Sequence, residues 1–172
     1  IITGLAENAQ KPAVQKACED FIADYKAYST LPQEYLGGEK TMTQEAFNEH
    51  IEKMRRVLTP HYVESPKALL ENGLDNLERQ LSSQYRFGVE TQMVKDFERT
   101  STQYKYVFEN NLVTVEIITE GDYTGPSPDG DGSLVQARIT NYDTVVLQKV
   151  GGVWKVVSAH IGTNQKGEYH GV

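Results

Sequence analysis

The chain has a single cysteine, Cys18, among its 172 residues. It therefore cannot form an internal disulfide. Cys18 lies at helical spacing from apolar residues on both sides, Val14 and Phe21 among them. A thiol inside such an apolar stripe is typical of a buried structural cysteine, and we expect that role for Cys18.

Long apolar segments and an excess of basic residues are also absent. No apolar run approaches the roughly 20 residues that a membrane-spanning helix needs, so we expect no membrane span. Acidic residues outnumber basic ones by 24 to 17, which gives a formal net charge of −7. Such a surface is unfavourable for the phosphates of nucleic acids and for anionic lipids, which makes both poor partners.

The sequence lacks the spacings that mark common metal and cofactor sites. No two histidines occur at His-x-x-x-His spacing. There is no phosphate-binding loop, no nucleotide-binding glycine motif and no Gly-x-Ser-x-Gly motif. The acidic stretch 129–133 begins like an EF-hand, but Leu134 and Thr140 occupy the positions that require glycine and glutamate. We therefore predict no metal site and no cofactor, and interpret this stretch as an acidic turn.

Apolar residues recur at helical spacing in three N-terminal segments. The first is expected to begin at Pro12, because proline suits the first turn of a helix. In the second, Thr41 or Thr43 is the N-cap and Thr59-Pro60 ends the helix. The third is expected to begin at Ser65-Pro66. The predicted buried positions are Val14, Ala17, Cys18, Phe21, Tyr25 and Tyr28, then Phe47, Ile51, Met54 and Leu58, then Leu70, Leu74, Leu77 and Leu81.

After Ser83 the apolar residues alternate as they do in strands. The segment 120–133 is rich in Gly, Pro and Asp, which favours an exposed loop. Helices followed by strands predict an α+β fold, with three N-terminal helices packed on an antiparallel β-sheet. One domain is expected at this length, over 12–165, with a polar tail or linker at 1–11 and a C-terminal tail at 166–172. The expected strands are 85–93 (with a bulge near Met93-Val94), 104–108, 112–123, 134–150 and 153–163.

The register of two hairpins follows from their turns. Asn110-Asn111 and Gly151-Gly152 both suit two-residue turns with positive φ. The first predicts the pairs Phe108–Val113, Tyr106–Val115 and Tyr104–Ile117 on one face, and Lys105–Glu116 on the other. The second predicts Lys149–Trp154, Leu147–Val156, Val145–Ser158 and Asp143–His160 on one face, and Val146–Val157, Thr144–Ala159 and Tyr142–Ile161 on the other.

Both faces of the second hairpin are partly apolar. A sheet with two apolar faces needs a cover on each. The three helices can cover one face, and a second copy of the sheet can cover the other. We therefore expect a homodimer through the outer face of the sheet.

Asp143 and His160 form the strongest candidate for a chemical site. Facing Cβ atoms of antiparallel strands lie about 5 Å apart, so Asp143 can orient the imidazole and make His160 a general base. The alternative is an exposed pair of little energetic consequence. Asn141 and Asp143 also interrupt an apolar row, as the polar floor of a pocket does. Tyr104 and Tyr106 are either core residues with hydroxyls at the rim or part of a ligand-binding wall. The candidate ligand-binding residues are Tyr104, Tyr106, Asn141, Asp143 and His160.

The stretch from Thr144 to His160 consists of an apolar strand, a tight turn, Trp154 and a second apolar strand. With the three helices before it, this stretch resembles the nuclear transport factor two superfamily over about residues 12–165. The resemblance implies a strongly bent, cone-shaped, cystatin-like sheet. That superfamily includes ketosteroid isomerases, polyketide cyclases, dehydratases and many non-catalytic domains, so the resemblance implies a fold and not a function. No catalytic residue is carried over. The chain also resembles secreted or lipid-anchored bacterial members of unknown role.

Three functions remain open. The first is a non-catalytic domain, extracellular or in the cell envelope, that binds a small molecule or protein through the mouth of the cone or the acidic loop. The chain begins at Ile1, and the polar residues 3–11 suit a linker after a signal or lipid-anchor segment. The second is a cofactor-independent isomerase, cyclase or dehydratase that uses Asp143 and His160 in an apolar cavity. The third is a structural dimerising module. We favour the first because the chain has no strong catalytic signature.

Overall fold

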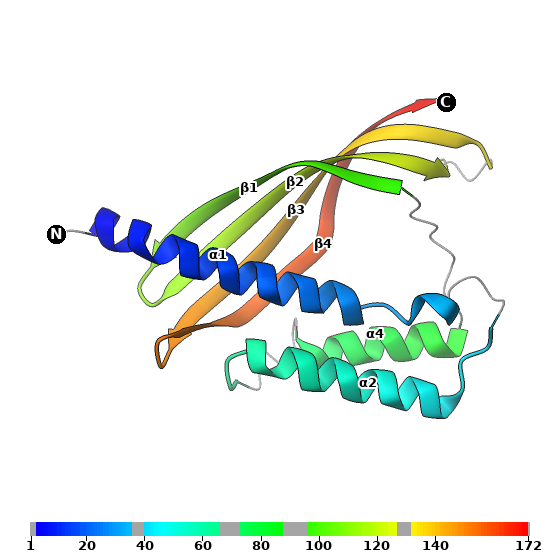
Figure 1. The fold of residues 1–172 in the computed structure, drawn as a ribbon, viewed down its shortest axis with the longest axis horizontal. Coiled ribbons are helices and arrows are strands. Elements are labelled where there is room, and N and C mark those ends of the chain that lie inside the picture. Colours follow the sequence, from blue (N-terminus) through cyan, green and yellow to red (C-terminus); the bar gives the residue numbers. More distant parts are fainter. Residues whose placement is uncertain (1–2, 36–39, 66–72, 88–95, 127–131, 172) are drawn as a thin grey trace.

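The computed structural model describes residues 3–35, 40–65, 73–87, 96–126 and 132–171. Within these ranges three α-helices precede four strands, and the strands form one antiparallel sheet in the order β1-β2-β3-β4 (Figure 1). The predicted α+β class, with helices before an antiparallel sheet, is therefore confirmed.

Helix α1 spans Thr3–Tyr28 and contains Pro12 in its interior. The predicted start at Pro12 is wrong, because the helix already runs through the residues before it. A proline inside a helix removes one backbone hydrogen bond, and here the helix continues through it. Val14, Cys18 and Phe21 are fully buried, as predicted, whereas Leu5 near the start is exposed. A linker role for residues 1–11 stays a prediction.

Helix α2 spans Gln44–Leu58 and matches its sequence pattern closely. Of the two proposed caps, Thr43 is the one used: its Oγ1 accepts a hydrogen bond from the Ala46 amide at 3.1 Å. A short 3-10 helix, η2, follows at Thr59–His61, so Thr59-Pro60 ends α2 as predicted. Another, η1, spans Gln33–Tyr35 before it. The predicted stripe of Phe47, Ile51, Met54 and Leu58 is buried.

Helix α4 spans Leu74–Phe87 and buries Leu74, Leu77 and Leu81. Its predicted start at Ser65-Pro66 falls at the edge of residues 66–72, which lie outside the described part of the chain, as does the bulge near Met93-Val94. The predicted strand at 85–93 is wrong for residues 85–87, which are helical. Tyr85 stacks on Phe47 of α2 with ring centroids 4.6 Å apart, so packing between the helices overrides the local alternation.

The strands are β1 (Asp96–Glu109), β2 (Leu112–Pro126), β3 (Leu134–Val150) and β4 (Val153–Gly171). They are longer than expected. The predicted strand 112–123 is confirmed as part of β2. The predicted exposed loop at 120–133, which overlaps it, is wrong for residues 120–126, because these continue β2 and pair with β3. Residues 127–131 lie outside the described part. Residues 166–171, predicted as a tail, pair with β3 as the end of β4.

The first hairpin has the predicted register. Phe108 faces Val113, Tyr106 faces Val115, Tyr104 faces Ile117, and Lys105 faces Glu116. Asn110 adopts a φ of 56° in the turn, which asparagine tolerates better than most residues. The alternation of apolar residues and the turn residues are therefore sufficient to predict the register of this hairpin.

The second hairpin follows its predicted register only next to the turn. Gly151 and Gly152 have φ of 57° and 81°, and Lys149 faces Trp154 and Leu147 faces Val156, as predicted. The register then shifts, because Val157 has no partner between Val156 and Ser158. A second shift lies between Tyr142 and Thr144. From Val157 onward every predicted pair is wrong, including Val146–Val157, and the observed pairs are Val146–Ser158, Val145–Ala159, Thr144–His160 and Tyr142–Asn164.

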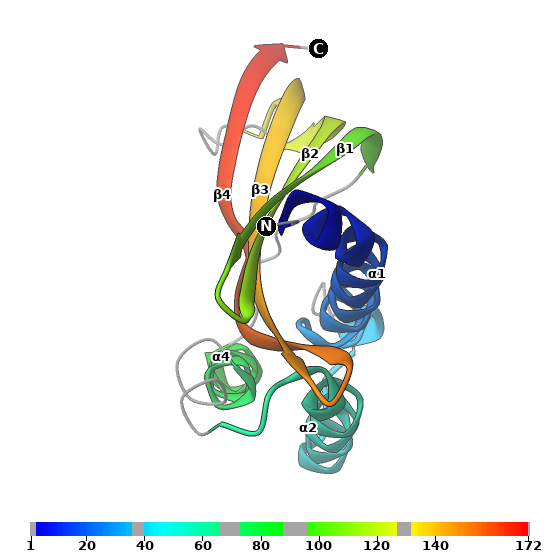
Figure 2. The ribbon, with the colours of Figure 1, turned by 90° about the vertical axis from the view of Figure 1, so that its left-hand side faces the viewer.

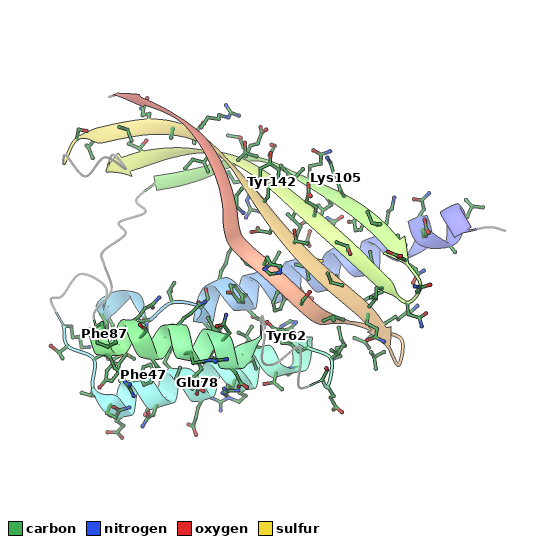
Figure 3. The ribbon with its side chains drawn as sticks, turned by 180° about the vertical axis from the view of Figure 1, so that it is seen from behind. Phe47, Tyr62, Glu78, Phe87, Lys105 and Tyr142 are labelled. Atoms are coloured by element: carbon green, nitrogen blue, oxygen red, sulfur yellow. The ribbon has the colours of Figure 1, made fainter. Side chains whose placement is uncertain are left out.

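The two faces of the sheet differ in their surroundings. We call the face that carries Val115 and Val145 the inner face; its side chains share one buried core with residues of all three helices. The opposite, outer face carries Lys105 and Tyr142, on the side away from α2 and α4 in Figure 3. Figure 2 shows α1 beside β1, with β4 at the other edge of the sheet. The exposed apolar residues of the outer face include Val107, Leu112, Leu134, Val150 and Val153.

Candidate functional site

The five predicted site residues do not form one cluster. Tyr104 and Tyr106 lie on the inner face of β1, and Asn141 and Asp143 lie on the inner face of β3. His160 faces Thr144, whose side chain belongs to the outer face. The set is therefore divided between the two faces of the sheet.

The predicted pairing of Asp143 with His160 is wrong. Asp143 is only 2% exposed, whereas His160 is exposed. The cause is the extra residue Val157, because a shift of one residue moves every later side chain of a strand to the opposite face. The two side chains therefore have the sheet between them and cannot act as a general-base dyad.

Asp143 lies in a polar band that crosses the inner face. It shares a cross-strand row with Tyr104 and Ile117, and the next row contains Thr102, Thr119 and Asn141. Thr119 is buried as well. Burial raises the pKa of Tyr25 on α1, and the nearby charge of Asp143 raises it further. The predicted interruption of the apolar row is thus present, and it lies beneath α1.

A groove of about 510 Å³ lies between α1 and β1. This space is more open than enclosed, so it is a groove on the surface and not an internal cavity. Tyr106, one of the predicted binding residues, supplies the β1 side, and no described residue of the other three strands lines it. The groove therefore opens beside the edge of the sheet. Its α1 side consists of Asn8, Lys11, Pro12, Gln15, Lys16 and Glu19.

Helical spacing places the α1 side chains over β1. Lys11, Gln15 and Glu19 recur every four residues and so share one helix face. The Tyr106 hydroxyl donates to Gln15 Oε1 at 3.3 Å, and the Tyr104 hydroxyl donates to Glu19 Oε1 at 3.4 Å. Gln15 Nε2 also donates to Glu19 Oε1, at 2.9 Å. The Lys11 ammonium lies 5.5 Å from the centroid of the Tyr106 ring, within the range of a cation–π contact.

The aromatic side chains of β1 form a ladder along the groove. The ring centroids of Tyr104 and Tyr106 are 6.3 Å apart, and those of Tyr106 and Phe108 are 6.4 Å apart. Burial raises the pKa of Tyr104 to about 12, helped by the charges of Glu19 and Cys18. Burial likewise raises the pKa of Tyr106. Both tyrosines therefore stay neutral and available as hydrogen-bond donors across the physiological pH range.

We expect the raised pKa of Tyr104 to make the fold lose stability at alkaline pH. An unfolded tyrosine loses its proton near pH 10, whereas folded Tyr104 keeps it to about pH 12. Between these values the unfolded state binds fewer protons, so the free energy of unfolding falls as pH rises. Urea midpoints from pH 8 to 12 should fall less steeply for Tyr104→Phe than for the wild type. Equal slopes would contradict this assignment.

Cys18 has the structural role expected from the sequence. Its side chain is fully buried, and burial raises the pKa of its thiol to about 12, with a further contribution from Glu19. A thiol that stays protonated is a poor nucleophile. The only cysteine of the chain therefore contributes packing beneath the Tyr104–Tyr106 ladder.

The structure contains another Asp–His pair, which the sequence pattern did not predict. His61 Nε2 lies 2.7 Å from Asp24 Oδ2, and the Phe21 ring meets the imidazole edge-on at 5.7 Å. Asp24 comes from α1 and His61 from η2, so no local spacing indicated the contact. Both side chains are partly exposed. The pair joins α1 to the segment after α2, and it lies outside the groove.

Comparisons with known proteins give the chain no relative. No family model, no curated protein and no solved structure matches it. Within the described ranges, no helix is long and apolar enough to cross a membrane. The same residues contain no group of three or more His, Cys, Asp and Glu side chains placed to hold a metal ion. The groove between α1 and β1 is therefore the candidate site that the geometry supports best.

Proposed function

We propose that the protein is a non-catalytic binding domain that holds a ligand or a protein partner in the groove between α1 and β1. The observation that carries this proposal is the groove itself, with Tyr106 on one side and Lys11 and Gln15 on the other. An aromatic surface beside amide and charged groups offers both apolar contact and oriented hydrogen bonds, as ligand sites usually do.

The enzymatic alternative has weaker support. It is a cofactor-independent isomerase, cyclase or dehydratase that needs Asp143 and His160 in one cavity. Asp143 is buried on the inner face, and His160 belongs to the outer face. The two groups of the proposed proton-transfer pair therefore belong to opposite faces of the sheet.

We also propose membership in the nuclear transport factor two superfamily, with its cone-shaped sheet and covering helices. Supporting features are the order of helices and strands and the last hairpin with Trp154 after its turn. Register shifts near Thr100, Asp143 and Val157 also support it, because bulges bend a sheet. An extracellular or cell-envelope location belongs to this proposal and rests on the sequence alone.

The expected homodimer through the outer face remains part of the proposal. Val107, Leu112, Val150 and Val153 are exposed there near the hairpin ends, and exposed apolar residues that gather on one face are typical of interfaces. Sedimentation equilibrium at high micromolar concentration should give the mass of a dimer for the wild type and of a monomer for Val153→Lys. A monomeric wild type would remove this part of the proposal.

The groove can be tested by screening a library of small metabolites with ligand-observed NMR. Bound compounds should shift the amide signals of Lys11, Gln15 and Tyr106, and binding should weaken about tenfold in Lys11→Ala/Gln15→Ala, which removes two of the groove's hydrogen-bonding side chains. Lys53→Ala, at an exposed position of α2, is the matched control and should bind normally. Compounds that instead shift Thr119, Asn141 and Asp143 would favour a cavity at the polar band and contradict the proposal.

A further inference from the structure

The two edges of the sheet differ. At the β4 edge, Tyr62 forms a parallel bridge with Val156, and the Val63 amide donates to the Val156 carbonyl at 2.9 Å. At the β1 edge, no strand or isolated bridge of the described residues pairs with the side of β1 that faces away from β2. A strand edge of this kind can accept a further strand.

The hairpin turn decides which backbone groups of β1 point outward. Glu109 and Leu112 flank the two-residue turn, and the pair next to such a turn exchanges both backbone hydrogen bonds. Hydrogen-bonded and non-hydrogen-bonded pairs then alternate along β1. Val107 and Lys105 therefore bond to β2. The amides and carbonyls that point away from β2 are those of Thr102, Tyr104, Tyr106 and Phe108.

The groove lies on the same side of the molecule as these outward groups. Among the described residues its lining comes from α1 and Tyr106, and α1 lies beside β1 in Figure 2. A strand added next to β1 would alternate its side chains between the two faces. Those on the inner face would enter the groove beside Lys11 and Gln15. Those on the outer face would lie next to Lys105, Val107 and Glu109.

We propose that the edge of β1 binds an extended peptide of a partner protein as an added antiparallel strand, with alternate peptide side chains in the groove between α1 and β1. This inference rests on the proposed function and specifies the partner. Backbone hydrogen bonds provide the affinity in this mode of recognition, and side-chain positions provide the specificity.

The charged side chains of β1 indicate which residues that peptide should carry. The outer-face positions of β1 are basic at Lys105, apolar at Val107 and acidic at Glu109. Opposite charges favour facing positions across strands, so the matching peptide is acidic, apolar and basic at the facing positions. On the inner face, aromatic or aliphatic residues match Tyr106 and Phe108. The chain's own segment 103–112 fits when it lies antiparallel with its valine opposite Val107, which places its glutamate opposite Lys105 and its lysine opposite Glu109.

A folded second copy paired in this register would bring its own α1 to the junction. The Tyr106 hydroxyl contacts Gln15, so α1 lies across from β1 at the centre of the pairing. An extended peptide needs only the space of one strand beside β1, about 4.8 Å from it, and it brings no helix to the junction.

The test uses the whole protein and a fluorescent synthetic peptide with the sequence of residues 103–112, measured by anisotropy. In the predicted register the peptide's Tyr106, Phe108 and Asn110 lie opposite Phe108, Tyr106 and Tyr104 of β1 and turn their amides toward it, and the peptide's Lys105 and Val107 turn theirs away. N-methylation of the first three should weaken binding about tenfold or more, and N-methylation of the other two should change it less than about twofold.

The charge pattern has its own paired test. Glu109→Lys in the protein should weaken binding of the native peptide about fivefold, and a peptide with glutamate in place of its lysine should recover that loss. A scrambled peptide should bind neither protein.

Three results would overturn the inference: equal loss from both methylated peptides, no recovery by the charge-swapped peptide, or self-association of the whole chain that protects the β1 amides. If the peptide fails to bind while metabolites still map to Lys11 and Gln15, only this inference fails. If the peptide does not bind and no metabolite maps to Lys11 and Gln15, both this inference and the proposed function are wrong.

Discussion

Replacing Phe21 with alanine should lower the free energy of unfolding by about 3–5 kcal/mol, the usual loss for a buried aromatic side chain. Phe21 is 0% exposed. Its ring packs edge-on against Tyr62 at 5.5 Å and tilted against Tyr25 at 5.8 Å. The truncation would therefore remove contacts between α1 and the chain after η2 at the same time as it opens a cavity.

Urea denaturation of Phe21→Ala, with Phe87→Ala as its control, checks this expectation. Phe87 is the same residue type at 84% exposure, and its removal should change the free energy of unfolding by less than about 0.5 kcal/mol. Similar losses in the two variants would contradict the packing of α1 against Tyr62.

Replacing Tyr62 with alanine should have the second-largest effect, a loss of about 3 kcal/mol. Tyr62 is 5% exposed, and its backbone bridges the edge of β4 at Val156. Burial raises the pKa of its hydroxyl well above the ordinary range, so the neutral ring fills the core. Lys155 Nζ donates to the Pro60 carbonyl at 2.5 Å and holds the same segment.

Tyr62→Phe separates the ring from its hydroxyl in the same denaturation assay. It should cost no more than about 1.5 kcal/mol, the net value of one hydrogen bond. In a double-mutant cycle with Phe21→Ala, Tyr62→Ala should show a coupling of about 0.5–1.5 kcal/mol for the aromatic pair. If the losses in free energy of unfolding of the two single variants simply add in the double variant, direct packing of the two rings is contradicted.

Local patterns predicted those parts of the fold that depend on local chemistry. The α2 stripe from Phe47 to Leu58 and the Thr43 cap follow from helical spacing and one side-chain hydrogen bond. The register of the first hairpin follows from Asn110-Asn111 and strict alternation. The conformation of each of these elements depends on residues close together in the chain, so the local sequence pattern is enough to predict it.

The register of the second hairpin could not be predicted from local sequence patterns alone. Val156 and Val157 are both β-branched and apolar, so either can face inward, and alternation alone does not show which one is extra. The structure buries Val156 and leaves Val157 without a partner strand residue. One undetected bulge therefore moved His160 to the outer face and removed the predicted catalytic pair.

The candidate site was predicted in part. Tyr106 was named because it shares a face with aliphatic residues, and it lines the groove. Lys11, Gln15 and Glu19 were missed, because their contacts with Tyr104 and Tyr106 of β1 span 85–95 residues of chain. Their position depends on how α1 lies over β1, and helical periodicity says nothing about the docking of a helix on a sheet.

Amide hydrogen exchange along β1 of the free protein tests the central claim most directly, because the peptide proposal requires an open edge beside the groove. We predict that the amides of Tyr104, Tyr106 and Phe108 exchange quickly, while those of Lys105, Val107 and Glu109, bonded to β2, are protected. Uniform protection of all six would mean that the edge is already covered. That result would contradict β1 as the place where a partner binds.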